Sequence, residues 1–349
     1  MMASKLRTMA LPLVAALVAA LPLAAQEVHR VSGARVAVYN LAGQTHVVRG
    51  TGSDVVVRVT RGGGDASRLE IETGAVGDRE TLRVRYPDNQ IVYPEVGRGS
   101  RTTVHVRSDG TFWGDESGGD EVEIRGSGRG LEAWADLTIE VPAGKDVAVY
   151  VALGEMDARG VQADLLLHTG SGSVQATDIT GSLGVDTGSG SAMVTAIRGS
   201  LKVDTGSGSV TVRDVQGDEV MVDTGSGRVG GGALRAASVR VDTGSGSINL
   251  DGVDSPDVGL DTGSGSVDVV LLRDVDNLNV DTGSGSVTIH APADLGGQVE
   301  IETGSGGIDM DFAVQVRSVR RDRVVGTLGD GQGTIQIDTG SGSIRLLKR

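Results

Sequence analysis

Seven copies of Asp-Thr-Gly-Ser are the residues of this chain whose types and spacing could do chemistry. They begin at Asp186, Asp204, Asp223, Asp242, Asp261, Asp281 and Asp338. The same four residues surround the catalytic aspartate of pepsin-like proteases, in which two carboxylates share one proton and activate water. Such a dyad needs two copies that converge in an apolar cleft, whereas copies at constant spacing form a row. The spacing therefore argues against an aspartic protease.

Calcium binding is the second chemistry that these repeats could support. Glycine- and aspartate-rich repeats can stack carboxylates around Ca²⁺ between the coils of a β-roll. This repeat lacks the two-aspartate nonapeptide of those proteins, and Thr-Gly-Ser-Gly supplies few hard oxygen ligands. We expect instead that each aspartate accepts backbone N–H bonds from the turn that follows it. A calcium-stabilised β-roll remains the alternative.

Glycan-active enzymes on β-helices are the third possibility, because they place carboxylates and basic residues on one face. The five histidines are scattered along the chain, and the repeats lack aromatic platforms for sugars. The histidines are His29, His46, His105, His168 and His290. We therefore predict no enzyme and name no catalytic, cofactor-binding or metal-binding residue.

The elements that position these aspartates are repeats of about 18 to 21 residues. Thr-Gly-Ser-Gly begins at Thr169, Thr187, Thr205, Thr224, Thr243, Thr262, Thr282, Thr303 and Thr339. The last gap, 36 residues, is twice 18. Such a period is typical of a solenoid, in which each unit buries its apolar face only against its neighbours.

One repeat predicts two strands and two turns. Apolar and polar residues alternate in 201–204 and 210–213, so Leu201, Val203, Val210 and Val212 should point inward. Gly206-Ser207-Gly208 makes the first bend and Gln216-Gly217-Asp218 the second. The pattern favours one coil of a parallel β-solenoid. Antiparallel hairpins would explain the turns but not why each copy keeps the same heptapeptide.

In a parallel solenoid the acids should form one line, about 4.8 Å apart. The expected order is Asp186, Asp204, Asp223, Asp242, Asp261, Asp281 and then Glu302. Two unit charges at that spacing repel by roughly 0.9 kcal/mol in water. The row two positions earlier supplies only two cations, Lys202 and Arg240. Turn amides or bound cations must therefore offset the repulsion, and we expect the amides to do so.

The N-terminal part divides into a signal and a cap. Residues 1–26, with Lys5, Arg7 and an apolar run, are typical of a cleaved export signal. Without them the chain has 30 basic and 46 acidic residues, a net charge of −16, which argues against nucleic acid as a partner. No cysteine is present, and no later segment is long enough to span a membrane as a helix.

Residues 27–146 are expected to form a β-rich capping region, and residues 147–349 the solenoid. Five stretches of the cap are predicted strands: 36–39, 55–59, 69–71, 82–86 and 137–141. Residues 97–130 are rich in glycine, aspartate and arginine, which predicts a long exposed excursion. Near the C-terminus, four arginines in residues 317–323 could contact an anion, although a solvated loop is the simpler interpretation.

Three stretches carry a resemblance to a known family. They are Ala-Asp-Leu-Thr-Ile-Glu-Val-Pro-Ala-Gly at 135–144, the repeated Asp/Glu-Thr-Gly-Ser-Gly-Ser-Val, and the ending over 324–344. These features resemble a bacterial family of putative adhesins, a domain of unknown function with β-strand repeats. The resemblance implies a β-repeat fold and an adhesin-like role, and it brings no catalytic residues.

The sequence thus predicts an all-β protein, an exported parallel β-solenoid with an irregular N-terminal cap. Its expected location is the bacterial periplasm, the medium or the cell surface. Its expected partner is an envelope or surface protein or glycan, and we expect neither a cofactor nor a membrane-spanning segment once the signal is removed.

Overall fold

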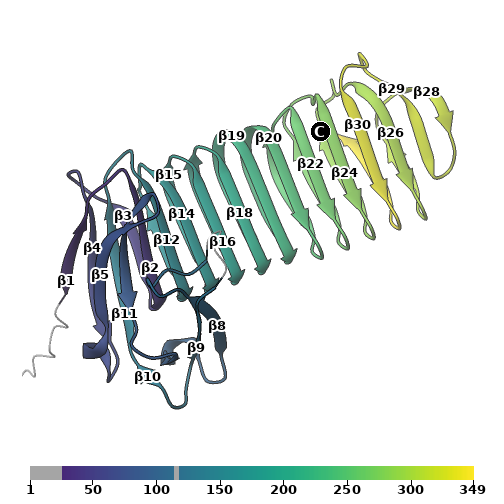
Figure 1. The fold of residues 1–349 in the computed structure, drawn as a ribbon. Helices are drawn as coiled ribbons and strands as arrows, with labels where there is room; N and C mark the ends of the chain where they lie inside the picture. Colours follow the sequence, from purple (N-terminus) through teal and green to yellow (C-terminus); the bar gives the residue numbers. More distant parts are fainter. Residues whose placement is uncertain (1–25, 114–117) are drawn as a thin grey trace, which may run out of the picture.

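The chain forms a rod of stacked β-coils with a smaller sheet beside its N-terminal end (Figure 1). The computed structural model describes residues 26–113 and 118–349. Within these ranges there is no α-helix, only two short 3-10 segments, η1 (Ala66–Arg68) and η2 (Pro94–Val96). The predicted export signal lies outside the described residues, apart from Gln26.

Two faces of the rod carry its parallel strands. The first face contains the strands that lead into the first bend of each coil, which is Thr-Gly-Ser-Gly from β14 onward: β2 (Arg35–Ala42), β12 (Asp146–Leu153), β14 (Asp164–Ser171), β16 (Leu183–Ser189), β18 (Leu201–Ser207), β22 (Asp257–Thr262), β24 (Asn277–Thr282), β26 (Gly297–Thr303) and β30 (Thr334–Thr339). The second face contains the strands that follow those bends: β3 (Thr45–Arg49), β13 (Met156–Arg159), β15 (Val174–Thr180), β17 (Ala192–Arg198), β21 (Ile248–Asp254), β23 (Val267–Leu271), β25 (Val287–Ala291), β27 (Ile308–Met310) and β31 (Ile344–Lys348). Two long strands, β19 (Val210–Ser226) and β20 (Val229–Thr243), bend from the second face into the first face of the next coil.

Residue-by-residue pairing confirms the parallel β-solenoid. β18 lies between β16 and β19, with Asp204 paired to Asp186 on one side and to Asp223 on the other. The predicted inward residues Leu201, Val203, Val210 and Val212 are all buried, at 0–1 % exposure. They join one continuous core along the rod, which the antiparallel-hairpin alternative would not produce.

A further corner divides each coil and was not expected from the sequence. Equivalent residues at this corner have positive φ between 51° and 90°: Asp178, Ala196, Asp214, Ala233 and Gly252. Left-handed backbone turns the chain after the second-face strand, so the next apolar residue points inward again. In three coils that residue is Ile179, Ile197 or Val215, each at 0–1 % exposure.

The threonine and the second glycine of each Thr-Gly-Ser-Gly lock neighbouring coils together. Thr262, which is fully buried, donates its hydroxyl hydrogen to the carbonyl oxygen of Gly246 at 2.8 Å. A Cβ placed on Gly246 would meet the carbonyl oxygen of Gly227 at 1.8 Å. The equivalent threonines from Thr169 to Thr339 make the same kind of bond. Close stacking of the coils thus requires glycine at this position. The buried threonine hydroxyl in turn needs the carbonyl oxygen of that glycine as its hydrogen-bond acceptor.

The C-terminal coil does not stack in sequence order. β30 pairs with β24 on one side and with β26 on the other, so residues 334–348 lie between the coil of 277–291 and the coil of 297–310. The expected contact of Asp281 with Glu302 is therefore wrong, because Asp338 lies between them. Beyond β26, the hairpin β28 (Val314–Val319) and β29 (Arg323–Leu328) ends the first face.

The N-terminal end extends each of the two faces with one further parallel strand and then with antiparallel strands. On the first face β2 is followed by β6 (Arg79–Arg85) and β5 (Glu70–Val76). On the second face β3 is followed by β11 (Trp134–Val141), β4 (Val55–Gly62) and β1 (Glu27–Val31). Each predicted strand of this region is found. The boundary at residue 147 stays a prediction, and β2 and β3 already stack in register on β12 and β13.

A second, smaller core corrects the expectation of a long exposed excursion over 97–130. β7 (Gln90–Val92), β8 (Arg101–Val106), β9 (Asp120–Arg125) and β10 (Leu131–Glu132) form a four-stranded sheet. Its side chains Val104, Phe112, Val122 and Ile124 are buried against Leu41 and Leu153 of the first coils. The apolar residues are spaced among glycines and charges, which concealed the strands in the sequence.

Candidate functional site

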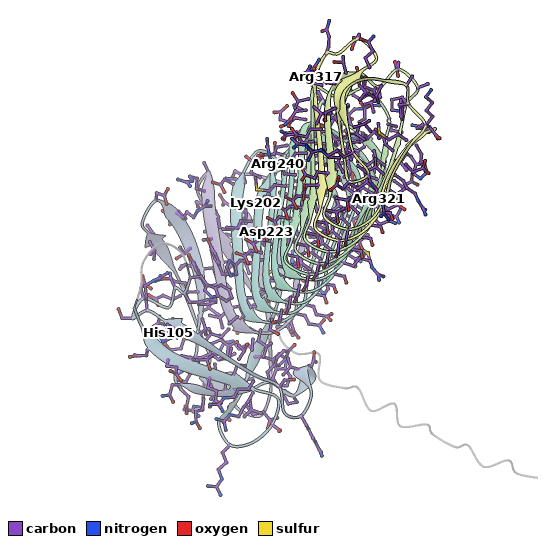
Figure 2. All side chains as sticks on the ribbon, turned by 90° about the vertical axis from the view of Figure 1, so that its right-hand side faces the viewer. His105, Lys202, Asp223, Arg240, Arg317 and Arg321 are labelled. Carbon is purple, nitrogen blue, oxygen red and sulfur yellow. The ribbon has the colours of Figure 1, made fainter. Side chains whose placement is uncertain are left out.

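The main surface feature of the rod is a row of eight carboxylates on the first face, here called the acidic ladder. In stacking order it contains Asp186, Asp204, Asp223, Asp242, Asp261, Asp281, Asp338 and Glu302. Figure 2 shows Asp223 beside Lys202 and Arg240 on this face. At about 4.8 Å per coil, the row is roughly 34 Å long.

The backbone amides of the turns do not serve the ladder carboxylates, which corrects the sequence-based expectation. In the described part of the chain, no backbone N–H donates to a ladder carboxylate. The turn amides instead pair with carbonyls of the next coil, as in Gly208 N–H to Ser226 O at 3.2 Å and Val210 N–H to Arg228 O at 2.9 Å. The ladder charges therefore face solvent without support from the turns.

Neighbouring cations do not neutralise the middle of the ladder either. Arg240 directs its guanidinium away from the row, to Asp257 at 2.7 Å and to the hydroxyl of Ser238 at 2.8 Å. Lys202 forms no ion pair within the described ranges. Among the described residues, basic side chains contact the ladder only at its two ends: His168, whose pKa burial lowers, lies beside Asp186, and Arg323 forms an ion pair with Glu302.

Crowding of like charges affects the acidity of the ladder. Burial first, and then the neighbouring Asp242 and Asp281, raises the pKa of Asp261 above its ordinary value. Burial, Asp281 and Glu302 raise the pKa of Asp338 in the same way. Both carboxyls hold a proton more readily in the folded chain than in the unfolded chain, because burial and, after it, the neighbouring carboxylates disfavour the charged form.

Asp261→Asn is expected to raise the melting temperature at pH 7 by roughly 1 to 2 °C. A carboxyl whose pKa is raised by folding destabilises the fold at pH values above the raised pKa. That penalty is lost as the pH falls below the ordinary pKa of 3.8. The gain should therefore disappear below about pH 4, which thermal unfolding at the two pH values measures.

The matched control for this variant is Asp268→Asn on the second face. Asp268 points outward between Asn249 and Thr288, so it has no carboxylate neighbour in its row. Its replacement should leave the melting temperature unchanged at both pH values. Equal gains for the two variants at pH 7 would show that ladder repulsion is not their cause.

The N-terminal end of the ladder is aromatic. His168 precedes Asp186 in the row, and its Nδ1 lies 3.2 Å from a carboxylate oxygen of Asp186. The indole of Trp113 stacks on the imidazole, with ring centres 3.9 Å apart, and Tyr150 continues the row. Burial lowers the pKa of His168, although Asp186 and Asp204 act in the opposite direction. No pattern around Trp113 in the sequence indicates that it returns to the coils.

The C-terminal end of the ladder is basic. Arg323, one of the four arginines of the 317–323 segment, contacts Glu302 at 3.5 Å and also pairs with Glu300. Arg317 donates to the side-chain oxygen of Gln298 at 2.8 Å, while Arg320 and Arg321 are exposed at the hairpin tip. Figure 2 shows Arg317 and Arg321 at this end of the rod. One arginine of the segment thus ends the ladder, and the others remain on the surface.

The histidines do not form a constellation in the part of the chain that the structure describes. His29 lies near Glu27, His46 near Asp157, and His168 at the ladder. His105 is on β8 in the side sheet, well away from the ladder (Figure 2). No three histidine, aspartate or glutamate side chains of the described residues cluster as a metal site requires. The prediction that no residue is catalytic or binds a metal stays a prediction.

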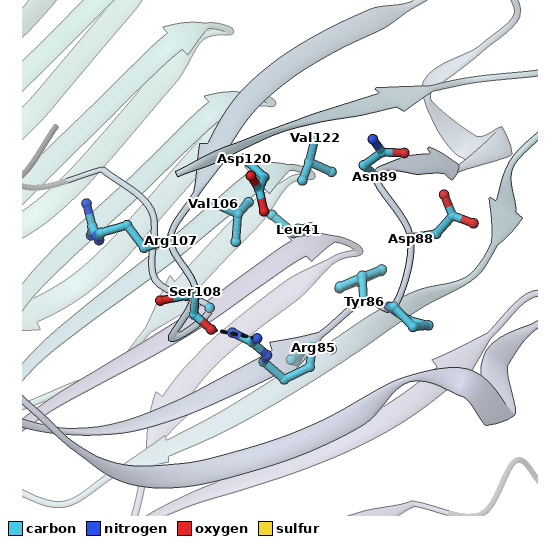
Figure 3. Close-up of a pocket in the computed structure, with 13 residues that line it drawn as sticks. Leu41, Arg85, Tyr86, Asp88, Asn89, Val106, Arg107, Ser108, Asp120 and Val122 are labelled. Atoms are coloured by element: carbon cyan, nitrogen blue, oxygen red, sulfur yellow. Dashed lines mark hydrogen bonds between the residues drawn. The ribbon is translucent and has the colours of Figure 1, made fainter. Parts of the chain in front are cut away.

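Two hollows accompany the ladder and the side sheet. Gly259 leaves a depression of about 390 Å³ on the first face, bordered by Met221, Arg240, Asp261 and Asn279. The second hollow, of about 290 Å³, opens between the side sheet and the first coils. Figure 3 shows its apolar floor and a polar rim; its labelled residues are Leu41, Arg85, Tyr86, Asp88, Asn89, Val106, Arg107, Ser108, Asp120 and Val122. Sequence reasoning missed this second hollow because it missed the side sheet.

Comparison with known proteins identifies the family. Residues 132–347 match the family described as Toastrack DUF4097, which covers more than half of the chain. The chain belongs to the Toastrack DUF4097 family. This confirms the resemblance found in the sequence, and Toastrack is a β-solenoid fold, as the coils show.

Other comparisons add little to the Toastrack assignment. A solved structure from Clostridium sporogenes ATCC 15579, described as a putative cell adhesion protein, is 10 % identical. The alignment covers 93 % of this chain and 99 % of that one, with a TM-score of 0.26. No curated protein matches the sequence. None of the described helical segments of this Toastrack protein is long and apolar enough to cross a membrane.

Proposed function

We propose that this Toastrack protein is an exported, non-enzymatic interaction protein of the bacterial envelope or surface, and that the acidic ladder faces its partner. The observation that carries the proposal is the row of eight carboxylates, which basic side chains of the described residues contact only at its two ends. A row of like charges lowers the stability of the fold at neutral pH. The repetition of the carboxylate in coil after coil is therefore best explained by a role in binding. A partner with cationic groups would relieve the repulsion on binding.

The shape of the face supports an extended partner. The row runs along a rod, and the hollow at Gly259 is a shallow depression beside it. Small-molecule sites usually enclose their ligand, whereas a long straight face suits a protein or a glycan chain. The pattern of residues 1–26 supports export, and export would bring the ladder outside the cytoplasm.

Binding of residues 27–349 to isolated envelopes tests the role of the ladder. The double variant Asp223→Asn/Asp242→Asn is expected to bind at least about tenfold more weakly than the wild type, and added salt should weaken wild-type binding. The control Asp251→Asn/Asp268→Asn removes two outward charges from the second face and should bind like the wild type. Equal binding by both variants would refute the role of the ladder.

Two further measurements test the remaining parts of the proposal. Fractionation of cells that express the full chain should place the processed protein in the periplasm, the medium or the cell surface. Incubation with envelope polysaccharides should give no turnover. Turnover that a single carboxylate substitution abolishes would show that the protein is an enzyme, and an unprocessed cytoplasmic chain would contradict export.

A further inference from the structure

At each end of the first face, the last described strand pairs with a neighbour on one side only. In the described ranges, β5 pairs only with β6, and β28 pairs only with β29. Figure 1 shows these strands at opposite ends of the rod. An edge strand with open N–H and C=O groups can accept a strand from another chain unless it is covered or protected. Neither edge is covered by another element in the described structure, since β28 is exposed along nearly its whole length and β5 along most of it.

Exposed apolar side chains are found at both ends of the rod. Five large apolar residues are exposed in the described structure, and the two most exposed, Val319 at 64 % and Val316 at 53 %, lie on β28. Val28 on β1, at the opposite end, is 49 % exposed. Exposed apolar residues on an edge strand indicate a contact surface, although β28 also has a β-bulge between Val316 and Ser318.

The two edges carry opposite charge. β28 and its turn contribute Arg317, Arg320, Arg321 and one acid, Asp322, whereas β5 contributes Glu70 and Glu72 and no basic residue. Glu72 is 51 % exposed, although it also contacts Arg83 and Arg85 of β6. Charge complementarity therefore favours pairing of β28 with β5 over pairing of either strand with itself.

Strand direction and side-chain orientation are compatible with that pairing. β28 runs with the parallel stack and β5 runs against it, so the two strands would meet antiparallel. Ile71 and Val314 pack against the core, which leaves Glu72 and Arg317 on the outer face. A β-bulge between Val316 and Ser318 leaves Arg317 without a register partner on β29. In the proposed pairing Arg317 would lie near Glu72 on the outer face, while Val316 extends the apolar interior.

The outlines of the two ends also match. At the C-terminal end, β29 and β28 extend the first face beyond the last second-face strand, β27. At the N-terminal end, the second face is the longer one, because β11, β4 and β1 follow β3 while only β6 and β5 follow β2. The longer first face at the C-terminal end can therefore meet the shorter first face at the N-terminal end of the next copy. A gap of about one strand spacing, 4.8 Å, would remain between the two second faces.

We propose that copies of this chain associate head to tail, with β28 of one copy extending the first face onto β5 of the next. Such a contact is heterologous, so repeated addition produces a filament rather than a closed dimer. The acidic ladder would then recur along each filament. This association does not depend on the proposed partner of the ladder, because it uses only the ends of the rod.

Sedimentation of residues 27–349 over a range of concentrations tests the association. The wild type should show a mass that increases with concentration. Val316→Lys, which places a charge on the free edge of β28, should weaken association at least about tenfold. Met193→Lys is the matched control, because Met193 is 50 % exposed in the middle of the rod, and it should behave like the wild type. A wild type that stays monomeric, or equal effects of the two variants, would refute the proposal.

Cross-linking distinguishes head-to-tail contact from the alternatives. The chain has no cysteine, so Ser318→Cys on β28 and Thr73→Cys on β5 each introduce a single thiol. With a short bismaleimide, the mixture of the two proteins should cross-link much more than either protein alone. Dominant cross-linking of the Ser318→Cys protein with itself would show tail-to-tail dimers and would overturn the head-to-tail arrangement.

Discussion

Gly246→Ala is expected to destabilise the rod by more than about 3 kcal/mol, a large effect for the addition of a single methyl group. The new Cβ would lie 1.8 Å from the carbonyl oxygen of Gly227, well inside van der Waals contact. The same region of backbone accepts the hydroxyl hydrogen of Thr262, so a displaced Gly246 also weakens the bond to the next coil. Because each coil contacts only its neighbours, the loss of stability is local. It weakens the interface between the coils on either side of Gly246.

Thermal unfolding followed by circular dichroism measures this effect. Gly259→Ala is the matched control, since its Cβ would meet only Arg240 Cγ at 3.8 Å, an ordinary contact. That variant should melt at the wild-type temperature or slightly above it, because alanine restricts the unfolded chain. If Gly246→Ala melted with Gly259→Ala, the coils would not be stacked as closely as described.

Val241→Asp is expected to cost several kcal/mol, because it buries a carboxylate without a partner. Val241 is 2 % exposed in the continuous core of the rod. Met193→Asp is the appropriate control, since Met193 is 50 % exposed with the neutral neighbours Gln175 and Thr211 in its row. It should change the free energy of unfolding by no more than about 0.5 kcal/mol. Similar losses of melting temperature in the two variants would contradict the assigned inward and outward residues.

Arg240, the outward neighbour of Val241, is unsuitable as that control. The alternation of the sequence correctly places it on the outside, and it is about half exposed. Its guanidinium nevertheless pairs with Asp257, so an aspartate at this position would face another carboxylate. Outward position alone does not make a substitution neutral.

Local patterns predicted most of the coil. The alternation around Asp204 identified which residues are inward, and the glycine pair after Thr205 located the bend, because both follow from backbone geometry within a few residues. The left-handed corner at Asp214 and Ala233 was missed, since neither aspartate nor alanine marks such a backbone as glycine does.

The order of the coils could not be predicted, because every coil carries the same bend. Asp338 fits beside Asp281 as well as Glu302 does, and only the antiparallel hairpin β28–β29, with its turn at residues 320–322, returns the chain between two earlier coils. The side sheet was missed for a different reason. Its buried residues, such as Phe112 and Ile124, contact segments that are distant in sequence.

The hydrogen bond at the bend was also assigned from the sequence to the wrong side chain of the repeat. The aspartate was expected to bind the turn, but the buried threonine does so, as Thr243 does through the carbonyl of Gly227 at 3.1 Å. Sequence alone does not show which hydroxyl is buried when threonine and serine both flank the bend. The aspartates therefore remain available on the surface.

The central claim is that the acidic ladder is an open face rather than a metal-bound structural element. It is tested by the melting temperature of residues 27–349, measured in chelator and in millimolar calcium at matched ionic strength. Each ladder carboxylate has ladder neighbours only before and after it in the row, whereas Ca²⁺ takes six to eight oxygen ligands. We predict nearly the same melting temperature in both solutions. A rise of many degrees with calcium, absent with sodium at the same ionic strength, would contradict the open face and support the calcium-stabilised β-roll.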